Sequence, residues 1–195
     1  MACGGGVPAG PRPVHPSRPR QHRAGALTGH RSVGSDPLVR QVGEAGLLDH
    51  NARSEELSTK ASYKHSWQYG KRCIIPAMSF DEPNWETGKN IWWRFRRADG
   101  APWALAGLWN TWTDKATGEM VESYTLLTLN ADKHPLMSRM HKPDPKLGPD
   151  AQDKRSVVPI ELEDVDAWLH GTPEQAQALV RLAPAETFDV GPVAR

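Results

Sequence analysis

The sequence predicts an α+β fold: an antiparallel, curved or barrel-like β-sheet with a few flanking helices, preceded by a disordered N-terminal tail. Three observations support this class. Short apolar or β-type runs follow one another between residues 71 and 129, joined by loops of a few residues. Apart from one signal near Ser54, helix signals come late in the chain. All 8 Trp, 3 Tyr and 3 Phe lie at or beyond Tyr63, so the aromatic material for a core is confined to the later part.

Residues 1–45 differ in composition from the rest of the chain. They are rich in Gly, Pro, Arg and His and show neither a helical nor a strand period. Such a segment buries too little apolar surface to offset its chain entropy. We therefore expect residues 1–45 to be a disordered or misassigned tail, and residues 46–195 to form one domain. The alternative is a nucleic-acid arm made by five of its arginines, Arg12, Arg18, Arg20, Arg23 and Arg31.

Four strands are expected, over residues 72–76, 91–96, 103–112 and 122–129. Turn residues at 98–102 separate the second strand from the third, and residues 114–118 have the composition of a hairpin loop. Gly107, inside the third strand, indicates a bulge or a close approach of another backbone. A further strand is expected to end at Phe80. Because short loops join successive strands, we expect antiparallel neighbours in a meander.

Helices are expected from near Ser54, over residues 163–169 and over residues 172–183. The last has the clearest start signal, with Thr172 as N-cap, Pro173 in the first turn and Gln175 at the third helical position. It should end by residue 183, because the proline that follows cannot continue a helix.

Composition limits the classes of function. The formal net charge of +1 neither indicates nor excludes nucleic acid, because a balanced protein can carry a local basic groove. Two cysteines, Cys3 and Cys73, form neither a disulfide framework nor a zinc-site spacing, so we expect no metal and no cofactor. No apolar run approaches the roughly 20 residues of a membrane span, and residues 1–30 lack the apolar part of a secretory signal. We expect a cytoplasmic monomer without membrane contact.

The most informative pattern lies between residues 51 and 82. Asn51-Ala-Arg53 places an amide close to a guanidinium, an apolar run follows at 72–77 (Arg-Cys-Ile-Ile-Pro-Ala), and a carboxylate comes at Glu82. This pattern resembles the core motifs of the SOS response-associated peptidase (SRAP) family, whose members process abasic sites in single-stranded DNA. The resemblance covers about residues 51–169, and the part before Asn51 is divergent or missing.

The resemblance implies roles for individual residues. In the family, the Asn of Asn-Ala-Arg lies at the active centre and hydrogen-bonds the sugar-derived adduct, which implies that role for Asn51. Arg53 would contact a DNA phosphate, a task suited to a planar fork of donors. The implied DNA-binding residues are Arg53, Arg139 and Arg155. Without the resemblance, Asn51 is a turn or cap residue, and Arg53 forms an ion pair with Glu55 or Glu56.

Glu82 is the expected acid of the site. The family context is Gly-Phe-Tyr-Glu-Trp, whereas here Asp81 stands in place of the Tyr and Pro-Asn precedes Trp85. Two adjacent carboxylates leave Asp81 as an alternative, although the spacing from Cys73 favours Glu82. A half-buried carboxylate with a raised pKa would exchange protons with an amine or water near neutral pH. Without the resemblance, Glu82 is a solvated loop acid.

The histidine has several candidate positions. Aligning the family pattern His-Asp-Arg-Met-Pro on Arg139 puts Met137 where the histidine belongs. Aligning on the apolar pair at 157–158 instead makes His141 the histidine, followed by an inserted loop. We prefer His141, because a loop insertion costs little stability. His134 is the second choice.

Other reactive and aromatic residues have simpler interpretations. Cys73 lies in an apolar strand and is expected to be a buried, inert thiol; a Cys73–His141–Asn51 protease triad is the less favoured alternative. Several strand tryptophans must be core, and one or two are expected to be exposed as stacking platforms for bases. These strand tryptophans are Trp92, Trp93, Trp103, Trp109 and Trp112.

The nucleophile is the point where the sequence departs from the family. There, a cysteine becomes the first residue after methionine removal, and its amine forms a Schiff base with the aldehyde of the ring-opened abasic sugar. Its thiol then closes a thiazolidine ring. Here the chain begins Met1-Ala2-Cys3, so removal of Met1 exposes Ala2 and leaves Cys3 only an amide nitrogen. Cys3 is the candidate catalytic cysteine, yet the chain as written is not expected to crosslink DNA.

The resemblance therefore implies an abasic-site processing protein that acts on single-stranded DNA in the SOS response to DNA damage. Its activities would be a covalent thiazolidine DNA–protein crosslink and an autopeptidase reaction that exposes the cysteine. Asn51 would orient the adduct, Glu82 would handle protons at the amine, and His141 would assist ring opening or release. The alternatives are a non-catalytic single-stranded-DNA-binding module and an unstable truncated product.

Overall fold

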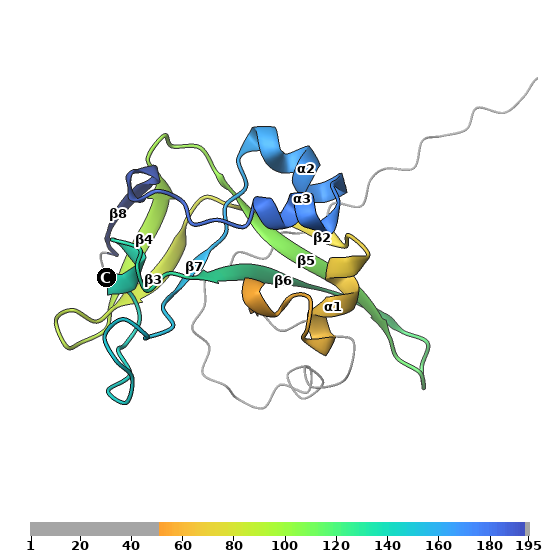
Figure 1. Ribbon diagram of the computed structural model, residues 1–195, viewed down its shortest axis with the longest axis horizontal. Coiled ribbons are helices and arrows are strands. Elements are labelled where there is room, and N and C mark those ends of the chain that lie inside the picture. Colours follow the sequence, from red (N-terminus) through yellow and green to blue (C-terminus); the bar gives the residue numbers. More distant parts are fainter. Residues whose placement is uncertain (1–50, 194–195) are drawn as a thin grey trace, which may run out of the picture. The chain divides into compact units, whose positions relative to one another are not determined.

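The computed structural model describes residues 51–193. The tail expected at 1–45, with Cys3, and the domain boundary expected at residue 46 lie outside these described residues. Within them the chain forms eight strands and three α-helices (Figure 1). No helix in this part is long and apolar enough to cross a membrane.

The larger sheet has five strands and carries most of the candidate site. Its order is β1–β6–β5–β2, and β7 also pairs with β6. The strands are β1 (Asn51–Arg53), β2 (Arg72–Ala77), β5 (Trp103–Thr113), β6 (Met120–Asn130) and β7 (Arg155–Val157). β1 runs parallel to β6, and the other pairs are antiparallel. The strands predicted at 72–76, 103–112 and 122–129 are confirmed with slightly wider bounds.

The smaller sheet contains β3 (Phe80–Asn84), β4 (Ile91–Arg97) and β8 (Phe188–Pro192), all antiparallel. Its existence makes the predicted meander wrong, because β4 and β5 follow each other in sequence yet belong to different sheets. The second sheet is held by aromatic packing: Phe80 stacks on Phe95 at 5.0 Å, and Phe188 meets Phe95 edge-on at 5.8 Å. The strand expected to end at Phe80 begins there instead, so Glu82 lies inside β3, opposite Trp93.

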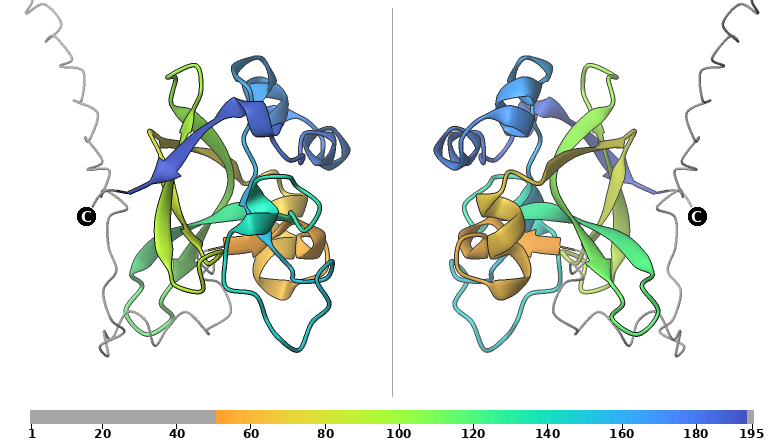
Figure 2. Two further views of the ribbon diagram at one scale, coloured as in Figure 1. Left: turned by 90° about the vertical axis from the view of Figure 1, so that its left-hand side faces the viewer. Right: turned by 90° about the vertical axis from the view of Figure 1, so that its right-hand side faces the viewer.

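The strands of both sheets are curved, and neither sheet closes on itself (Figure 2). The predicted α+β class with a curved, mainly antiparallel sheet is therefore confirmed, in its open rather than its barrel form.

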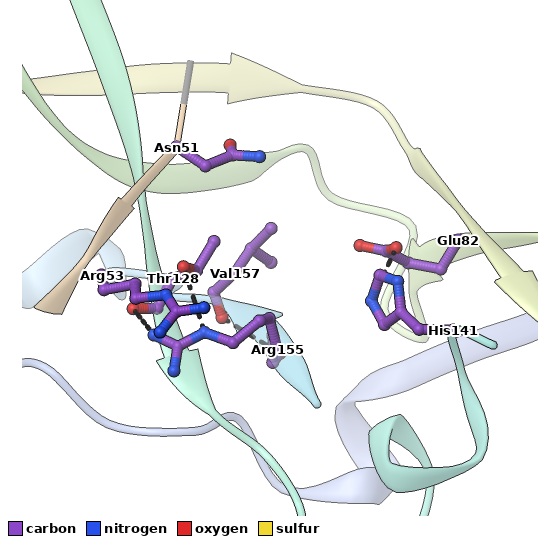
Figure 3. A pocket seen from close by; sticks show the side chains of 8 residues that line it. Asn51, Arg53, Glu82, Thr128, His141, Arg155 and Val157 are labelled. Atoms are coloured by element: carbon purple, nitrogen blue, oxygen red, sulfur yellow. Dashed lines mark hydrogen bonds and ion pairs between the residues drawn. The ribbon is translucent and has the colours of Figure 1, made fainter. Parts of the chain in front are cut away.

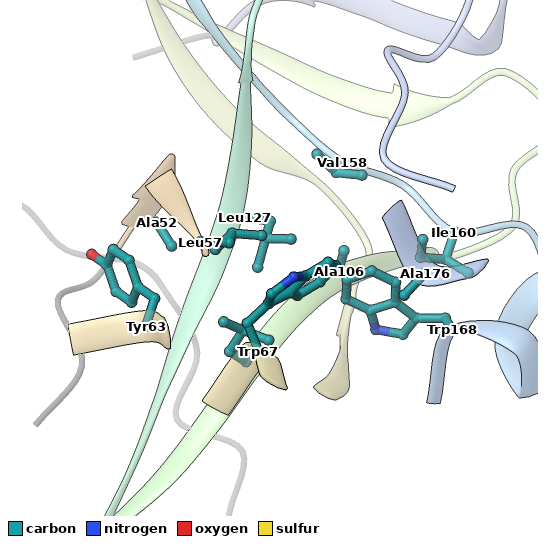
Figure 4. Close-up of a cluster of buried hydrophobic side chains, with 11 residues drawn as sticks. Ala52, Leu57, Tyr63, Trp67, Ala106, Leu127, Val158, Ile160, Trp168 and Ala176 are labelled. Atoms are coloured by element: carbon teal, nitrogen blue, oxygen red, sulfur yellow. The ribbon is translucent and has the colours of Figure 1, made fainter. Parts of the chain in front are cut away.

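β5 separates two hydrophobic clusters, because successive side chains of a strand point to opposite faces. Ala106 and Leu108 enter the first cluster, whereas Trp103 and Leu105 enter the second. Figure 4 shows the first cluster, which consists of Ala52, Leu57, Tyr63, Trp67, Ala106, Leu108, Leu127, Val158, Ile160, Trp168 and Ala176. The first cluster supports the larger sheet, and the second joins the two sheets, because it also contains Phe95 of β4 and Phe188 of β8.

Gly107 marks a close approach between strands. A Cβ atom there would lie 2.8 Å from Ile75 Cδ1 and 2.9 Å from both Cys73 Sγ and the Thr125 carbonyl oxygen. Such distances are well inside van der Waals contact, so only glycine fits. The close backbone approach predicted at this position is confirmed.

The helices follow the sequence signals unevenly. The start expected near Ser54 is a short 3-10 turn, Ser54–Glu56, and α1 (Ala61–Gln68) comes later without having been predicted. Tyr63 and Trp67, four residues apart on α1, both bury into the first cluster. Further 3-10 turns are Met137–Arg139, Leu162–Asp164 and Ala185–Thr187.

The two late helices are confirmed as α2 (Val165–His170) and α3 (Pro173–Ala178). α3 has the predicted capping box, in which Thr172 Oγ1 accepts from the Gln175 N–H and Gln175 Oε1 accepts from the Thr172 N–H. α3 ends at Ala178, earlier than the predicted limit of 183, and Leu179 and Val180 then pack against the first cluster.

A buried guanidinium joins α2 to the larger sheet. Arg72, at the start of β2, is 5% exposed and lies against the neighbouring rings of Trp67 and Trp168, 5.8 and 5.9 Å from their centroids. It donates hydrogen bonds to the carbonyl oxygens of Trp168 and Gly171, at the C-terminal end of α2. In return, Trp168 Nε1 donates to the Cys73 carbonyl at 2.9 Å. These contacts fix α2 against β2.

Candidate functional site

The candidate site is a pocket of about 230 Å³ between the two sheets. Its walls come from β1, β3, β6, β7 and the loop that follows the 3-10 turn at Met137–Arg139. The lining residues are Asn51, Arg53, Glu82, Thr128, His141, Arg155, Ser156 and Val157. The structure thus brings Asn51, Glu82 and His141 together, although about ninety residues separate the first from the last.

β1 places the amide and one guanidinium at the pocket. Asn51 and Arg53 are aligned with Leu126 and Thr128 of β6, and the alternation of the strand turns both side chains to one face while Ala52 is buried on the other. Tyr63 Oη donates to the Asn51 carbonyl at 3.2 Å, which fixes the start of the strand from α1. The Asn51 amide is therefore presented on a paired strand.

Glu82 and His141 face each other on one side of the pocket (Figure 3). His141 Nε2 lies 3.3 Å from Glu82 Oε2, and the Glu82 side chain is only 18% exposed. The two atoms are close but do not form a hydrogen bond, and Nε2 is buried without a hydrogen-bond partner.

The protonation of this pair is set by its surroundings. Burial, with a smaller contribution from the charge of Asp81, raises the pKa of Glu82 to about 7. Burial lowers the pKa of His141, and the nearby Lys154 ammonium lowers it further. Near neutral pH the carboxyl therefore holds a proton much of the time, while the imidazole is neutral. The pair can both give and accept a proton without a large change of pH.

The two adjacent carboxylates lie in different surroundings. Asp81 points away from Glu82 on β3, and its two oxygens accept hydrogen bonds from Arg94 Nε and Nη2, both at 2.8 Å. Asp81 is therefore an ion-pair partner on the surface, and Glu82 is the acid that lines the pocket.

His141 reaches the pocket through an unusual backbone conformation. Its φ angle of 62° is in the left-handed region, which residues with a side chain seldom adopt. The His141 N–H donates to the Pro83 carbonyl at 2.6 Å, and the His141 carbonyl accepts from Lys154 Nζ at 2.7 Å. Both sides of the strained residue are thus tied to neighbouring elements.

The other side of the pocket is a cluster of charges. Arg53 Nη2 lies 2.5 Å from Asp153 Oδ2, and Arg155 Nη1 lies 3.1 Å from the other Asp153 oxygen. Arg155 also binds both Glu55 oxygens, at 3.2 and 2.8 Å, and donates to the Thr128 carbonyl at 2.8 Å. Arg53 therefore pairs with Asp153, and not with Glu55 or Glu56 as in the alternative to DNA binding.

The two arginines of this cluster differ in availability. The Arg155 side chain is 17% exposed and has carboxylate partners on two sides, whereas Arg53 is 53% exposed and pairs with one. Burial alone would raise the pKa of Glu55, but hydrogen bonds from Arg155 and from the backbone of Asn130 lower it to about 2. Arg155 is thus a fixed part of the pocket wall, whereas Arg53 is the arginine more available to a ligand from solvent.

Arg139 is not brought to this pocket. Its guanidinium forms two hydrogen bonds with Glu86, at 2.8 and 2.9 Å, and lies over the Trp93 ring at 5.3 Å. It lines a second cavity of about 480 Å³, which shares His141 with the first pocket.

The remaining candidates have structural roles. His134 is 7% exposed; its Nε2 lies 2.8 Å from the Ala183 carbonyl, and its Nδ1 accepts from the N–H groups of Leu136 and Met137. Met137 is fully buried and does not line the pocket. Burial raises the pKa of the Cys73 thiol to about 11, and Cys73 does not line the pocket, so the alternative protease triad is not assembled.

The tryptophans divide between core and surface. Trp103 and Trp168 are almost completely buried, whereas Trp109 is 41% exposed with Lys71 Nζ 5.4 Å from its ring centroid. Trp109 is cross-strand neighbour to Tyr124, which is 57% exposed. Among residues 51–193, no three His, Cys, Asp or Glu side chains gather in a way that could hold a metal ion.

The comparisons with known proteins decide the family. The sequence model described as SOS response associated peptidase (SRAP) matches residues 34–195. The chain belongs to the SRAP family. The match extends beyond the range 51–169 expected from the motifs, at both ends.

Three known proteins are similar over most of this chain. The chain is 27% identical over 162 residues to "Abasic site processing protein HMCES" from Xenopus tropicalis, which covers 74% of this chain and 44% of the relative. A solved structure from Bordetella bronchiseptica is 35% identical with a TM-score of 0.67, covering 74% of this chain and 65% of that one. A structure from Bacteroides thetaiotaomicron, 23% identical with a TM-score of 0.63, shares the fold over 74% of this chain and 58% of its own length. This chain spans less than two thirds of each.

Sequence reasoning missed three residues that line the pocket, Thr128, Ser156 and Val157. It also missed Lys154, whose Nζ donates to the His141 carbonyl. Nothing in their local sequence distinguishes them from ordinary strand residues. The one available signal was the charge run Asp153-Lys154-Arg155 immediately before an apolar pair.

Proposed function

We propose that this protein binds single-stranded DNA that contains an abasic site, and that the pocket holds the damaged sugar. The observation that carries the proposal is the convergence of the Asn51 amide on the Glu82–His141 proton pair in one pocket. Membership of the SRAP family and similarity to a protein named for abasic site processing support the same substrate. Arg53, half exposed at the rim, is suited to a phosphate of the strand.

The chemistry proposed for the pocket is capture of an aldehyde by an amine. An amine adds to the C1′ aldehyde of the ring-opened sugar, and loss of water from the adduct gives an imine. That loss requires a proton on the departing hydroxyl, which Glu82 in its protonated form can supply. Neutral His141 can accept a proton from the attacking amine or assist ring opening, and the Asn51 amide can hydrogen-bond a sugar hydroxyl.

The amine and thiol of one cysteine are the proposed nucleophiles. Addition of the thiol across the imine closes a thiazolidine and leaves a stable crosslink, with no oxidant or reductant required. This step needs Cys3 to carry a free amine, and an autopeptidase reaction is the proposed route to such a terminus. Cleavage after Ala2 by water, with Glu82 and His141 as proton carriers, would provide it.

The test compares two forms of the chain on the same DNA. One form is the full chain beginning with Met1, and the other is produced with Cys3 as its first residue. Each is incubated with single-stranded DNA carrying one abasic site and resolved on a denaturing gel, with undamaged DNA of the same sequence as control. A shifted band with the Cys3-first form, absent with its Cys3→Ala version, is the expected result. No covalent band with either form would refute the crosslinking activity.

Binding without covalent capture is the second candidate, favoured by the exposed Arg53 at the pocket rim. It is tested with the same DNA on a native gel at several salt concentrations. A shift that weakens with salt and is stronger for abasic than for intact DNA is expected, because phosphate contacts release counterions. Equal binding to both DNAs would refute a pocket for the lesion.

A further inference from the structure

Lys154 is a buried cation that has no assigned role. It is 6% exposed and comes immediately before β7. Its Nζ donates to the His141 carbonyl at 2.7 Å. Its own backbone is fixed on both sides, because the Lys154 N–H donates to Asp132 Oδ1 at 2.7 Å and its carbonyl accepts from the Ala131 N–H at 2.6 Å. The ammonium is therefore held at a defined place.

His141 needs such a support. With φ at 62°, its backbone is in a conformation that an ordinary residue leaves unless neighbours hold it. The Pro83 carbonyl holds the His141 N–H from β3, and Lys154 holds the His141 carbonyl from the β7 side. Loss of either anchor would allow the peptide to rotate and carry the imidazole away from Glu82.

We propose that Lys154 is a positioning residue, which holds the main chain of His141 in its left-handed conformation and so keeps the imidazole against Glu82. The role it serves rests on the proposed function, because Glu82 and His141 are the proton carriers there. The charge of Lys154 has a second, electrostatic effect on His141: a cation beside the imidazole disfavours the protonated form of the imidazole.

Other charged groups around the imidazole must be taken into account. Those that share a cavity with His141 are Arg53, Glu82, Arg155, Glu86, Arg139, Asp144 and Lys154. Among them, Lys154 is the one whose donor contacts the His141 main chain. The adjacent Lys142 is exposed and lies 5.3 Å from the centroid of the Trp85 ring. Lys142 thus offers a matched control, with the same charge in the same loop but a different contact.

The experiment compares Lys154→Met with Lys142→Met by NMR on the full chain. We expect Lys154→Met to move the titration midpoint of the His141 imidazole to higher pH and to reduce the hydrogen-exchange protection of the His141 N–H. We expect Lys142→Met to leave both close to wild type, and Lys154→Arg, which keeps the charge and a donor, to restore them in part. A His141 midpoint and protection that are the same in Lys154→Met as in wild type would overturn the proposal.

A measurement on the wild-type protein covers the case in which Lys154→Met does not fold. The Lys154 ammonium protons are expected to exchange slowly with water and to show a hydrogen-bond coupling to the His141 carbonyl carbon. Rapid exchange, like that of surface lysines, would overturn the proposal. Neither readout needs DNA, so intact NMR signatures in a protein that ignores abasic DNA would refute only the proposed function. In a crosslinking form, Lys154→Met should also shift the acidic limb of the rate profile to higher pH.

Discussion

Replacing Glu82 with glutamine should make the protein more stable at alkaline pH. Burial raises the pKa of Glu82 from 4.5 to about 7, so between these values the folded state holds a proton that the unfolded state has released. Below pH 4.5 the group has no effect on stability; as pH rises to 7 stability is lost, and above 7 the loss is constant. A shift of this size corresponds to roughly 3 kcal/mol. Glutamine has no charge to desolvate, so Glu82→Gln should escape this loss.

The assay is urea unfolding of both proteins at pH 4, 6 and 8. The difference in unfolding free energy should be smallest at pH 4 and should grow in favour of Glu82→Gln by up to roughly 3 kcal/mol at pH 8. Glu86→Gln is the control with the opposite sign, because hydrogen bonds from Arg139 and Asn84 lower the pKa of Glu86 to about 2. That variant should be less stable than wild type above pH 4.5, with a gap that closes as pH falls towards 2. A pH-independent gap for Glu82→Gln would refute the assignment of a buried, proton-holding carboxyl.

Three further predictions concern packing, a buried histidine and the pocket rim. Gly107→Ala should lower the unfolding free energy by about 1–3 kcal/mol in urea melts, because its Cβ would meet backbone as well as side chains. Gly191→Ala is the control, because the space around Gly191 is open. An equal loss of stability in the two variants would contradict the argument. His134→Ala should lower the unfolding free energy by about 2–4 kcal/mol in the same assay, because buried backbone groups lose their hydrogen-bond partner. The pH titrations of Glu82 and His141, which line the pocket, should not change. Arg53→Gln should make the salt dependence of single-stranded-DNA binding shallower by about 0.7 in log–log slope, whereas Arg181→Gln, far along the sequence and outside the pocket lining, should not.

Local sequence was sufficient where a segment carries its own signal. The β5–β6 hairpin was predicted from two long β-type runs around a Gly-containing loop, and α3 from its Thr172 capping box. The short strands were harder to predict, namely β1, β7 and β8. A segment of three to five residues forms a strand only when it pairs with a neighbouring strand. The division into two sheets depends on which aromatic rings pack together across the fold. These long-range contacts cannot be inferred from a local sequence pattern.

The site was predictable in its residues but not in its geometry. Family motifs pointed to Asn51, Glu82 and His141, and these three line one pocket; the roles given to them stay predictions. The left-handed backbone at His141 and the ammonium beneath it could not have been inferred, because a His before a Lys and a Pro gives no sign of its φ angle. Similarly, the partner of Arg53 depends on Asp153, a hundred residues later in the chain.

The guanidinium of Arg72 has a consequence for how this domain opens. Its charge lies against two indole rings, and it donates to carbonyl oxygens at the negative end of the α2 dipole. Unwinding the last turn of α2 would strand a cation in an apolar interior, so the usual fraying of a helix terminus is suppressed there. Amide protons at that terminus should therefore exchange on the same slow timescale as those of the central strands, which makes helix and sheet one cooperative unit.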